Sequence, residues 1–464
     1  MPWRESMEPV RMHRIAVLAP RESLRDVLVE IALLGVAELE SASEADIGEA
    51  SRLLAESPHG DVAPALQRGA PDPPAWARAG RTDLLAGEAQ LEARASAGVP
   101  RGRVVGMLGW APAGEVAAIA EAAAPHGGAV VTLPMPRGID PPTLVHADGG
   151  LNRSLAPLVD TYATVPYADV DPTVLAGLAF MVMFGMMFAD AGQGAVLLAG
   201  GLLLRAGRLP RLSGVRRIWP FVVGSAVAAI FFGVLFGEFF GPTGVIPTLW
   251  IKPLEEPVLL LEVAVGVGAT LLAGAYALGI VNRWREGGWR NALVATSGVA
   301  GAALFLGIGL IGLGAYAGAS WLVAVGVAVA VGGLVLAYVG LLAASGGGAA
   351  GATEAGVELF DGVIRLGTNV VSFARLAAFG LAHAALLAMV WQATTGLWSA
   401  GGVLILAAVV VFVVGNVVTF VLEGVVAGVQ ALRLEYYELF SRVFVSEGRA
   451  FQPWSIPCAT ERVP

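Results

Sequence analysis

The fold of this chain is decided by residues 375–423, which read RLAAFGLAHAALLAMVWQATTGLWSAGGVLILAAVVVFVVGNVVTFVLE. No Asp, Glu, Lys or Arg occurs between the arginine that opens this stretch and the glutamate that closes it. Because a helix needs about 20 mainly apolar residues to cross about 30 Å of hydrocarbon, so long a run predicts two helices in a lipid bilayer. The charged ends, Arg375 and Glu423, then lie inside apolar helices.

The composition of the whole chain agrees with a membrane protein. Of its 464 residues, 56% are hydrophobic and only 14% are charged, and its mean hydropathy is +0.71. About 25% charged residues is ordinary for a soluble globule, so most of this chain is expected to lie in lipid. The apolar residues are concentrated after Val174, whereas charges recur every few residues before it. Disordered, collagenous and disulfide-rich classes and a lone soluble enzyme are therefore excluded.

Charge and cysteine content exclude two further classes. The net charge of −8 argues against nucleic-acid binding. The single cysteine, Cys458, cannot form an intramolecular disulfide, so neither disulfide stabilisation nor redox chemistry is expected.

The apolar stretches predict a mainly α membrane protein with eight transmembrane helices, the last two of them long and tilted. Asp190 interrupts the first apolar run and divides it into a pair of short helices. The eight stretches lie at about 174–188, 191–204, 218–237, 259–281, 291–315, 320–344, 358–395 and 401–437.

The distribution of arginines predicts the orientation of these helices. The loops 241–256 and 392–400 offer only one basic residue, Lys252. Cytoplasmic loops carry an excess of Lys and Arg, so both termini are expected in the cytoplasm of a multi-pass cell-membrane protein. Charged residues at Arg4, Glu5 and Glu8 leave no apolar core for a signal peptide, so no cleaved leader is expected. The arginines of the other loops and the tail are Arg205, Arg208, Arg211, Arg216, Arg217, Arg283, Arg285, Arg290, Arg433, Arg442, Arg449 and Arg462.

Residues 1–150 are predicted to form a small α+β cytoplasmic domain of two lobes. Each lobe reads as a short apolar strand, a helix and a second strand. Residues 43–102 form a short, Pro-interrupted arm between the lobes, with one helix over 81–95, and 151–173 link this domain to the membrane domain, 174–464. The strand and helix segments of the lobes are 15–18, 22–35 and the stretch after Val36, then 103–110, 113–124 and 128–132.

The buried arginine is the strongest functional signal. An arginine at bilayer depth costs between about 3 and well over about 10 kcal/mol, and it stays charged in proteins. It must therefore face a partner or a water-filled cavity. The simplest partner is a structural ion pair with Glu423, but several other polar groups share the faces of the two helices.

These polar groups form two stripes that run toward opposite sides of the membrane. Asp361 lies about 21 Å before Arg375 at about 1.5 Å per residue and on nearly the same face, with Ser372 between them. His383 lies beyond Arg375, toward the exterior. On the next helix Glu423 lies on the outer side, with Gln430 and Arg433 further in.

Two offset stripes that meet at a permanent positive charge are what a rotary ion channel needs. Each stripe would form one half-channel. A carboxylate on a neighbouring rotor is neutral in lipid, because burial disfavours its charged form, and it ionises when it meets the arginine. Arg375 would also stop protons from passing directly between the two halves.

Several motifs resemble one known family. The segment Arg375-Leu-Ala-Ala-Phe-Gly-Leu-Ala-His383 is similar to the arginine helix of subunit a, also called subunit I, of V-type and archaeal A-type ATPases. The final helix with Glu423, Gln430 and Arg433 also resembles that family. Further resemblances are the segment around Asp190, the segment around Glu238, and the two lobes near Arg14–Glu40 and Trp110.

The resemblance implies a stator subunit in the membrane sector of a rotary ATPase. Its partners would be the proteolipid ring, peripheral-stalk subunits and subunits linked to the central stalk, with Arg375 and Arg433 facing the ring. Nucleotide hydrolysis belongs to other subunits of such complexes. No cofactor, metal or catalytic residue is therefore expected in this chain, which also lacks a phosphate-binding Gly-Lys-Ser/Thr loop.

The chain departs from the usual pattern of the family at three places. Ala189 stands where members usually carry Gly, and Asp361 stands where they carry Glu. The arm, 43–102, is much shorter than in typical members, which predicts a weaker contact with the peripheral stalk.

Two other functions remain as alternatives. One is a free-standing secondary transporter in which Arg375 binds an anionic substrate, although such proteins usually carry internal repeats. The other is a non-conducting, degenerate paralogue. The sequence also leaves open whether protons or sodium ions pass.

Overall fold

The computed structural model describes residues 9–40, 48–57, 62–135, 139–144, 150–208, 214, 216–444 and 447–459. The expectations at Arg4, Glu5, Glu8, Arg211 and Arg462 lie outside these residues. The chain forms two compact units. One comprises residues 9–145 with 448–464, and the other comprises 1–8 with 146–447.

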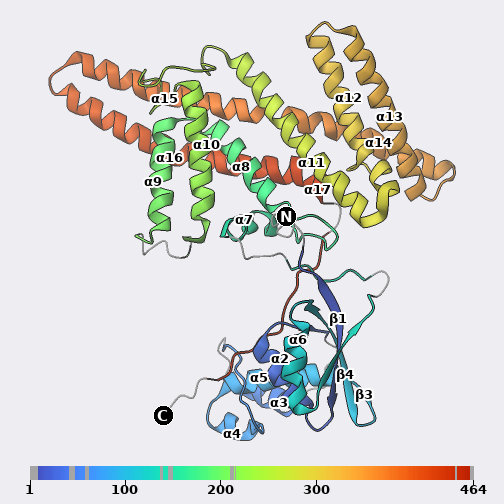
Figure 1. Cartoon of the computed structure of the whole chain (residues 1–464). Helices are drawn as coiled ribbons and strands as arrows, with labels where there is room; N and C mark the ends of the chain where they lie inside the picture. Colours follow the sequence, from blue (N-terminus) through green and yellow to red (C-terminus); the bar gives the residue numbers. More distant parts are fainter. Residues whose placement is uncertain are drawn as a thin grey trace. The chain divides into compact units, whose positions relative to one another are not determined.

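The smaller unit is built on one antiparallel sheet (Figure 1). Strand β1 (Met12–Pro20) pairs with β4 (Val104–Pro112) on one side and with β5 (Ala129–Leu133) on the other. The short strands β2 (Glu38–Leu39) and β3 (Val99–Arg101) both pair with β4. The strand order β2-β4-β1-β5 is that of the split βαβ arrangement.

Helices α2 (Leu24–Leu34) and α6 (Val116–Ala123), the latter followed by the 3₁₀ turn η1 (Ala124–His126), cover the sheet. Alternate side chains of β1, at Ile15, Val17 and Ala19, are buried, as the period of two along a strand requires. They form one core with the buried apolar residues of α2 and α6. The segments predicted as strand, helix and strand are therefore present.

The sheet corrects the prediction of two lobes. Val17 lies opposite Met107 and Ala19 lies opposite Val105, so the central strands of the two predicted lobes are direct neighbours. The reason is that an isolated pair of strands is marginally stable at best. Each strand, helix and strand unit gains a buried sheet face only by sharing one sheet with the other.

The predicted arm is a small helical cluster within this unit. Helices α3 (Glu49–Glu56), α4 (Pro73–Arg78) and α5 (Thr82–Ser96) pack around Trp76 and Leu85. Helix α5 confirms the helix expected over 81–95. Arg25 of α2 binds the buried Glu88 of α5 through Nε at 2.7 Å, so the cluster is fixed to the sheet domain.

The C-terminal segment also belongs to this unit. Trp454 and Ile456 lie in the same core as the sheet, and the backbone of Leu66 bridges to Cys458. The sequence predicts that this segment belongs to the membrane domain, 174–464. It folds instead with the sheet, because its apolar residues fill a core formed by residues more than about 300 positions earlier in the chain, where no local pattern could indicate them.

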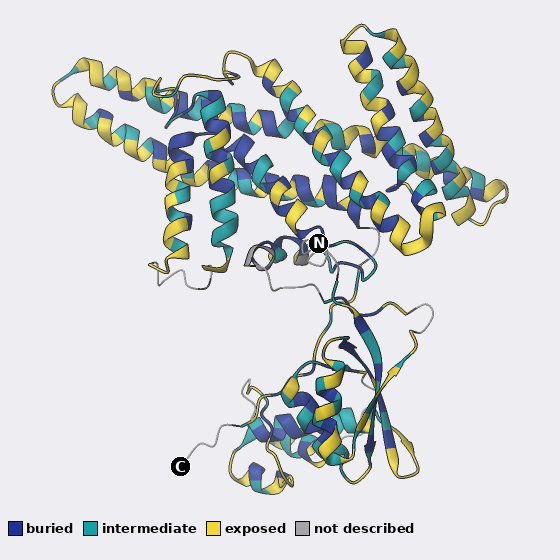
Figure 2. Cartoon of the chain, viewed as in Figure 1, coloured by how far each residue is buried: buried dark blue, intermediate teal, exposed yellow. Residues whose placement is uncertain are grey.

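The larger unit is helical (Figure 1). Figure 2 shows exposed residues along the outer faces of its long helices. The helices are α7 (Gly150–Asp160), α8 (Thr173–Met187), α9 (Ala191–Arg205), α10 (Trp219–Phe236), α11 (Pro257–Val294), α12 (Val299–Tyr316), α13 (Ser320–Ala344), α14 (Gly348–Ser372), α15 (Ala374–Ala400), α16 (Leu404–Leu434), the π-helix η3 (Glu435–Phe440) and α17 (Ser441–Val443).

Among the described residues, six helical segments are long and apolar enough to cross a membrane. They correspond to α10, α11, α12, α13, the joined α14 and α15, and α16 with its extension to Val443. Helices α8 and α9 are apolar but have only 15 residues each. The chain is therefore a multi-pass membrane protein, and the first two of the eight predicted spans are shorter than a full crossing.

A break just before Arg375 divides the helix that the sequence predicts as one segment over 358–395. Helix α14 ends at Ser372 and α15 begins at Ala374. Between them the fully buried Phe373 packs against Gly268 of α11, where a Cβ would lie 2.1 Å from the Phe373 Cγ. This contact places Arg375 in the first turn of α15.

A buried polar cluster fixes the linker before α8 to α11. Arg283 pairs with Glu286 and lies 3.7 Å from the buried carboxylate of Asp169. Asn282 Oδ1 accepts a hydrogen bond from the Val170 amide at 3.1 Å. Burial and the neighbouring Glu286 raise the pKa of Asp169 to about 7, and the charge of Arg283 opposes this shift.

Candidate functional site: a polar path to Arg375

The guanidinium of Arg375 is paired with Glu438 of the π-helix η3. Its Nη2 lies 3.4 Å from Glu438 Oε1, and the glutamate is only 5% exposed. The structural pair with Glu423 that the sequence left as an alternative is therefore not formed. Glu423 and Glu438 are separated by about 22 Å along the helix at about 1.5 Å per residue, and the break at Phe373 brings Arg375 beside the latter.

Glu438 also gathers two of the other predicted site residues. Both Ser372 and Arg433 lie close enough to interact with its carboxylate, as does Arg375. The π-helix supplies this geometry, since a wider turn changes which side chains share a face, and such turns are frequent at functional sites. The sequence analysis missed Glu438. Its signal was an acidic residue five positions after Arg433, just past the end of the apolar stretch 401–437.

A groove leads along α14 to this cluster. It has a volume of about 630 Å³ and is lined by Ile364, Thr368, Ser372 and Arg375, among others. A second groove of about 780 Å³ is lined by Glu354, Glu358, Asp361 and, again, Ile364. The two grooves share Ile364 and together extend over about 30 Å of helix.

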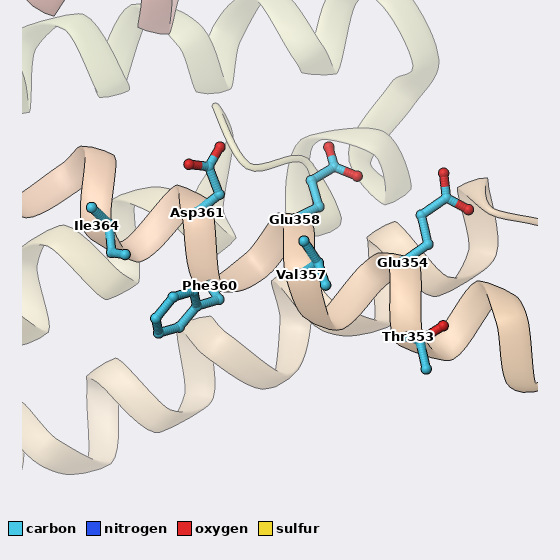
Figure 3. A pocket seen from close by; sticks show the side chains of 7 residues that line it. All are labelled: Thr353, Glu354, Val357, Glu358, Phe360, Asp361 and Ile364. Carbon is cyan, nitrogen blue, oxygen red and sulfur yellow. The ribbon is translucent and has the colours of Figure 1, made fainter.

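The end of this groove that lies farthest from Arg375 is acidic (Figure 3). The carboxylates of Glu354, Glu358 and Asp361 lie on the same side of α14 in Figure 3, as spacings of four and three residues require. Asp361 is paired with Arg365, and both side chains are exposed. Glu354 and Glu358 were not among the predicted site residues, although their spacing from Asp361 could have indicated them.

The hydroxyls further along this path are donors to the helix backbone. Ser372 Oγ donates to the Thr368 carbonyl at 2.9 Å, and Thr368 Oγ1 donates to the Arg365 carbonyl at 3.0 Å. Their lone pairs remain able to accept hydrogen bonds from water. The structure thus brings Asp361, Ser372 and Arg375 to one continuous surface.

The predicted outer residues lie in a more apolar environment. His383 is 1% exposed, and neither of its ring nitrogens has a described partner. Its ring lies 4.9 Å from that of Phe188, which also contacts Phe420 of α16 at 5.7 Å. Glu423 is 5% exposed, and Gln430 has a buried side-chain oxygen without a described partner.

Asp190 and Glu238 shape the turn between α8 and α9. Asp190 caps α9 by accepting from the Gln193 amide at 2.7 Å and also accepts from the Gly241 amide at 2.9 Å. The carbonyl of Glu238 accepts from the Ala191 amide at 2.9 Å. These bonds satisfy buried backbone groups that have no water partner in lipid, so both motif residues hold the fold of this region.

Comparison with known proteins yields a consistent group of relatives. No model of a protein family matches the chain. The A-type ATP synthase subunit I of Pyrococcus horikoshii is 25% identical over 365 residues, which are 75% of this chain and 53% of the relative. The A-type ATP synthase subunit I of Thermococcus kodakarensis is 26% identical over 370 residues, which are 75% of this chain and 53% of the relative.

The subunit I of Methanocaldococcus jannaschii is 27% identical over 333 residues, which are 64% of this chain and 46% of the relative. The chain spans about half the length of the curated relatives that it matches. These matches confirm the resemblance that the sequence motifs predict: the chain is similar to A-type ATP synthase subunit I of several archaea.

Proposed function

We propose that this chain is the stator subunit in the membrane sector of a rotary V/A-type ATPase and forms two ion half-channels against a proteolipid ring. The observation that carries this proposal is the open polar path that ends at the partly buried pair of Arg375 and Glu438. The chain catalyses no nucleotide chemistry itself. That chemistry belongs to other subunits, which contact it through the peripheral and central stalks.

The inner half-channel follows the groove along α14. Water in this groove connects Asp361 to Ser372 and Arg375. A ring carboxylate that arrives from lipid is neutral, and it releases its proton when it meets the positive charge of Arg375. Glu438 holds the guanidinium in place while the ring turns past it. The proton then leaves along the acidic mouth of the groove.

The outer half-channel involves His383, Glu423 and Gln430. All three carry polar atoms inside an apolar helix pair, and polar groups in such positions commonly mark ion pathways. Phe188 lies against His383 and closes this side from the neighbouring helices. Because the outer half-channel is separate from the inner groove, ions cannot cross the membrane without the ring.

The ring contacts the face of α16 that carries Arg433. This arginine is exposed. Val429, Leu422 and Val418 lie on the same face at helical spacing and are 57%, 52% and 57% exposed. A permanent charge beside an apolar stripe suits a partner that presents apolar helices and a carboxylate at membrane depth.

The proposal includes eight membrane helices, with α8 and α9 as a short hairpin, and both termini in the cytoplasm. The arginines at the α9–α10 turn and near the end of α11 then lie on the inner side, as the positive-inside rule requires. The acidic mouth of the α14 groove opens to the same side.

Photocrosslinking tests the ring contact. In a Cys458→Ala background, Ala378→Cys places a thiol one turn beyond Arg375 on an exposed position, and a benzophenone maleimide attached there is expected to crosslink a small proteolipid. Val331→Cys on α13, where the native side chain is 52% exposed, is the control and should crosslink lipid only. A secondary transporter would yield no proteolipid from either position.

Thiol labelling tests the sides of the two half-channels. In the same background, Asp361→Cys and Ser372→Cys are expected to react with a membrane-impermeant maleimide applied from the cytoplasmic side. His383→Cys and Glu423→Cys should react from the outer side, and more slowly, because these positions are 1% and 5% exposed. Labelling from the opposite sides in oriented vesicles would mean that the proposed topology is inverted.

A further inference from the structure

A cavity distinct from the two grooves along α14 lies among α8, α9, α10 and α16. Its volume is about 420 Å³, which is within the range of about 300–1,000 Å³ for small-molecule pockets. Phenylalanine rings form its wall. The ring centroids of Phe180 and Phe221 are 4.6 Å apart, and those of Phe184 and Phe188 are 5.4 Å apart. Gly424 and Gly428 of α16 line the cavity and place no side chain in it.

One buried polar atom lines this otherwise apolar cavity. Ser225 is 4% exposed, and its Oγ has no hydrogen-bond partner. The helical hydroxyls of Thr270, Thr394 and Ser441, by contrast, each donate to the carbonyl four residues earlier. A buried hydroxyl without a partner costs free energy, so a ligand that offers an acceptor oxygen at this point would be stabilised.

Basic residues lie at the end of α9 and the start of α10, two helices that line the cavity. Arg205 ends α9 and lies 4.7 Å over the ring of Trp219, which begins α10. Arg208 and Arg216 are exposed beside it. Ser225 lies about 9 Å along α10 from its start, close to the depth where the headgroup layer of about 6 Å meets the hydrocarbon.

We propose that this cavity binds one acyl chain of an anionic phospholipid. The chain lies against the phenylalanine wall, its ester carbonyl accepts a hydrogen bond from Ser225, and the phosphate interacts with Arg205 and its neighbours. Basic pockets between membrane helices commonly bind anionic headgroups. The inference requires only that the helices lie in a bilayer, so it is independent of the proposed stator function.

The ring is a poorer candidate for this cavity. Gly428 and Arg433 are five residues apart, which is about 140° around a helix of 3.6 residues per turn. The middle of the cavity wall on α16, at Gly424 and Gly428, is therefore turned away from Arg433, although Val425 at its edge adjoins the face proposed for the ring.

The test uses the full chain in phosphatidylcholine nanodiscs with a trace of phosphatidylglycerol whose acyl chain carries a diazirine. After illumination, mass spectrometry is expected to find the label on peptides of α10 and α16. Gly428→Leu should reduce this labelling about tenfold by filling the cavity; a Cβ at this position has no atom within 4 Å, so the backbone accommodates it. Ser225→Ala should reduce labelling about two- to tenfold through the lost hydrogen bond.

Gly332→Leu on α13, where a Cβ also meets no atom within 4 Å, is the matched control and should label as the native protein does. Labelling of the lipid-facing α13 peptides shows that each variant is inserted. Equal labelling of α10 and α16 in the native protein and Gly428→Leu would overturn the proposal, because only annular lipid would then be present. Equal labelling by a diazirine phosphatidylcholine would show that the headgroup assignment is wrong.

Discussion

Replacing Arg375 by alanine is expected to abolish ATP-driven ion pumping while the protein still assembles into its complex. The variant removes the charge that makes a ring carboxylate ionise, and without it the neutral carboxylate has no reason to release its proton at the junction. Assembly should persist, because the buried Glu438 that loses its partner can bind a proton, and burial favours the neutral form of a carboxyl group. The measurement is acidification of sealed vesicles, with co-purification of the other subunits as the assay for assembly.

Arg375→Lys is expected to fail as well. A lysine ammonium is compact and loses its proton more readily than a guanidinium when desolvated, and it cannot bind a carboxylate through two nitrogens. Arg290→Ala is the control, since Arg290 is an exposed arginine on α11, outside the polar path. Vesicles with Arg375→Ala that acidify at the native rate would contradict the stator function.

Glu438→Gln is expected to lower the pumping rate at least about tenfold. Breaking a buried ion pair by removing one partner typically costs about 3–5 kcal/mol, and the Arg375 side chain is 24% exposed, so the effect should be at or below the low end. A loss of about 1.4 kcal/mol already corresponds to a factor of ten. Without Glu438 the guanidinium has no fixed position at the end of the groove.

Glu435→Gln is the matched control for this variant. Glu435 lies in the same π-helix and is fully buried, but its carboxylate has no described hydrogen-bond partner. Its replacement is expected to leave the pumping rate close to that of the native protein. Native pumping by Glu438→Gln would mean that the pair with Arg375 plays no part in ion transfer. If Glu435→Gln lost pumping while Glu438→Gln kept it, Glu435 would be the functional carboxylate of η3.

Features that depend on neighbouring residues were predictable from the sequence. Long apolar runs are sufficient to identify membrane helices, because lipid requires each helix to satisfy its own backbone. The short apolar run at 15–18 and the helical period of 22–35 similarly predicted β1 and α2. The charged residue Arg375 was conspicuous in an apolar helix, and its motif was specific enough to indicate the family.

Which distant groups meet depends on the packing between segments. Arg375 of α15 pairs with Glu438 of η3, and Phe373 at the α14–α15 junction packs against Gly268 of α11. The single sheet depends on the pairing of Val17 with Met107 across the arm, and the place of Trp454 depends on a core formed by residues far earlier in the chain. Such contacts are set by packing between segments that share no local pattern, which is why Glu438 and the one-sheet domain could not be read from the sequence.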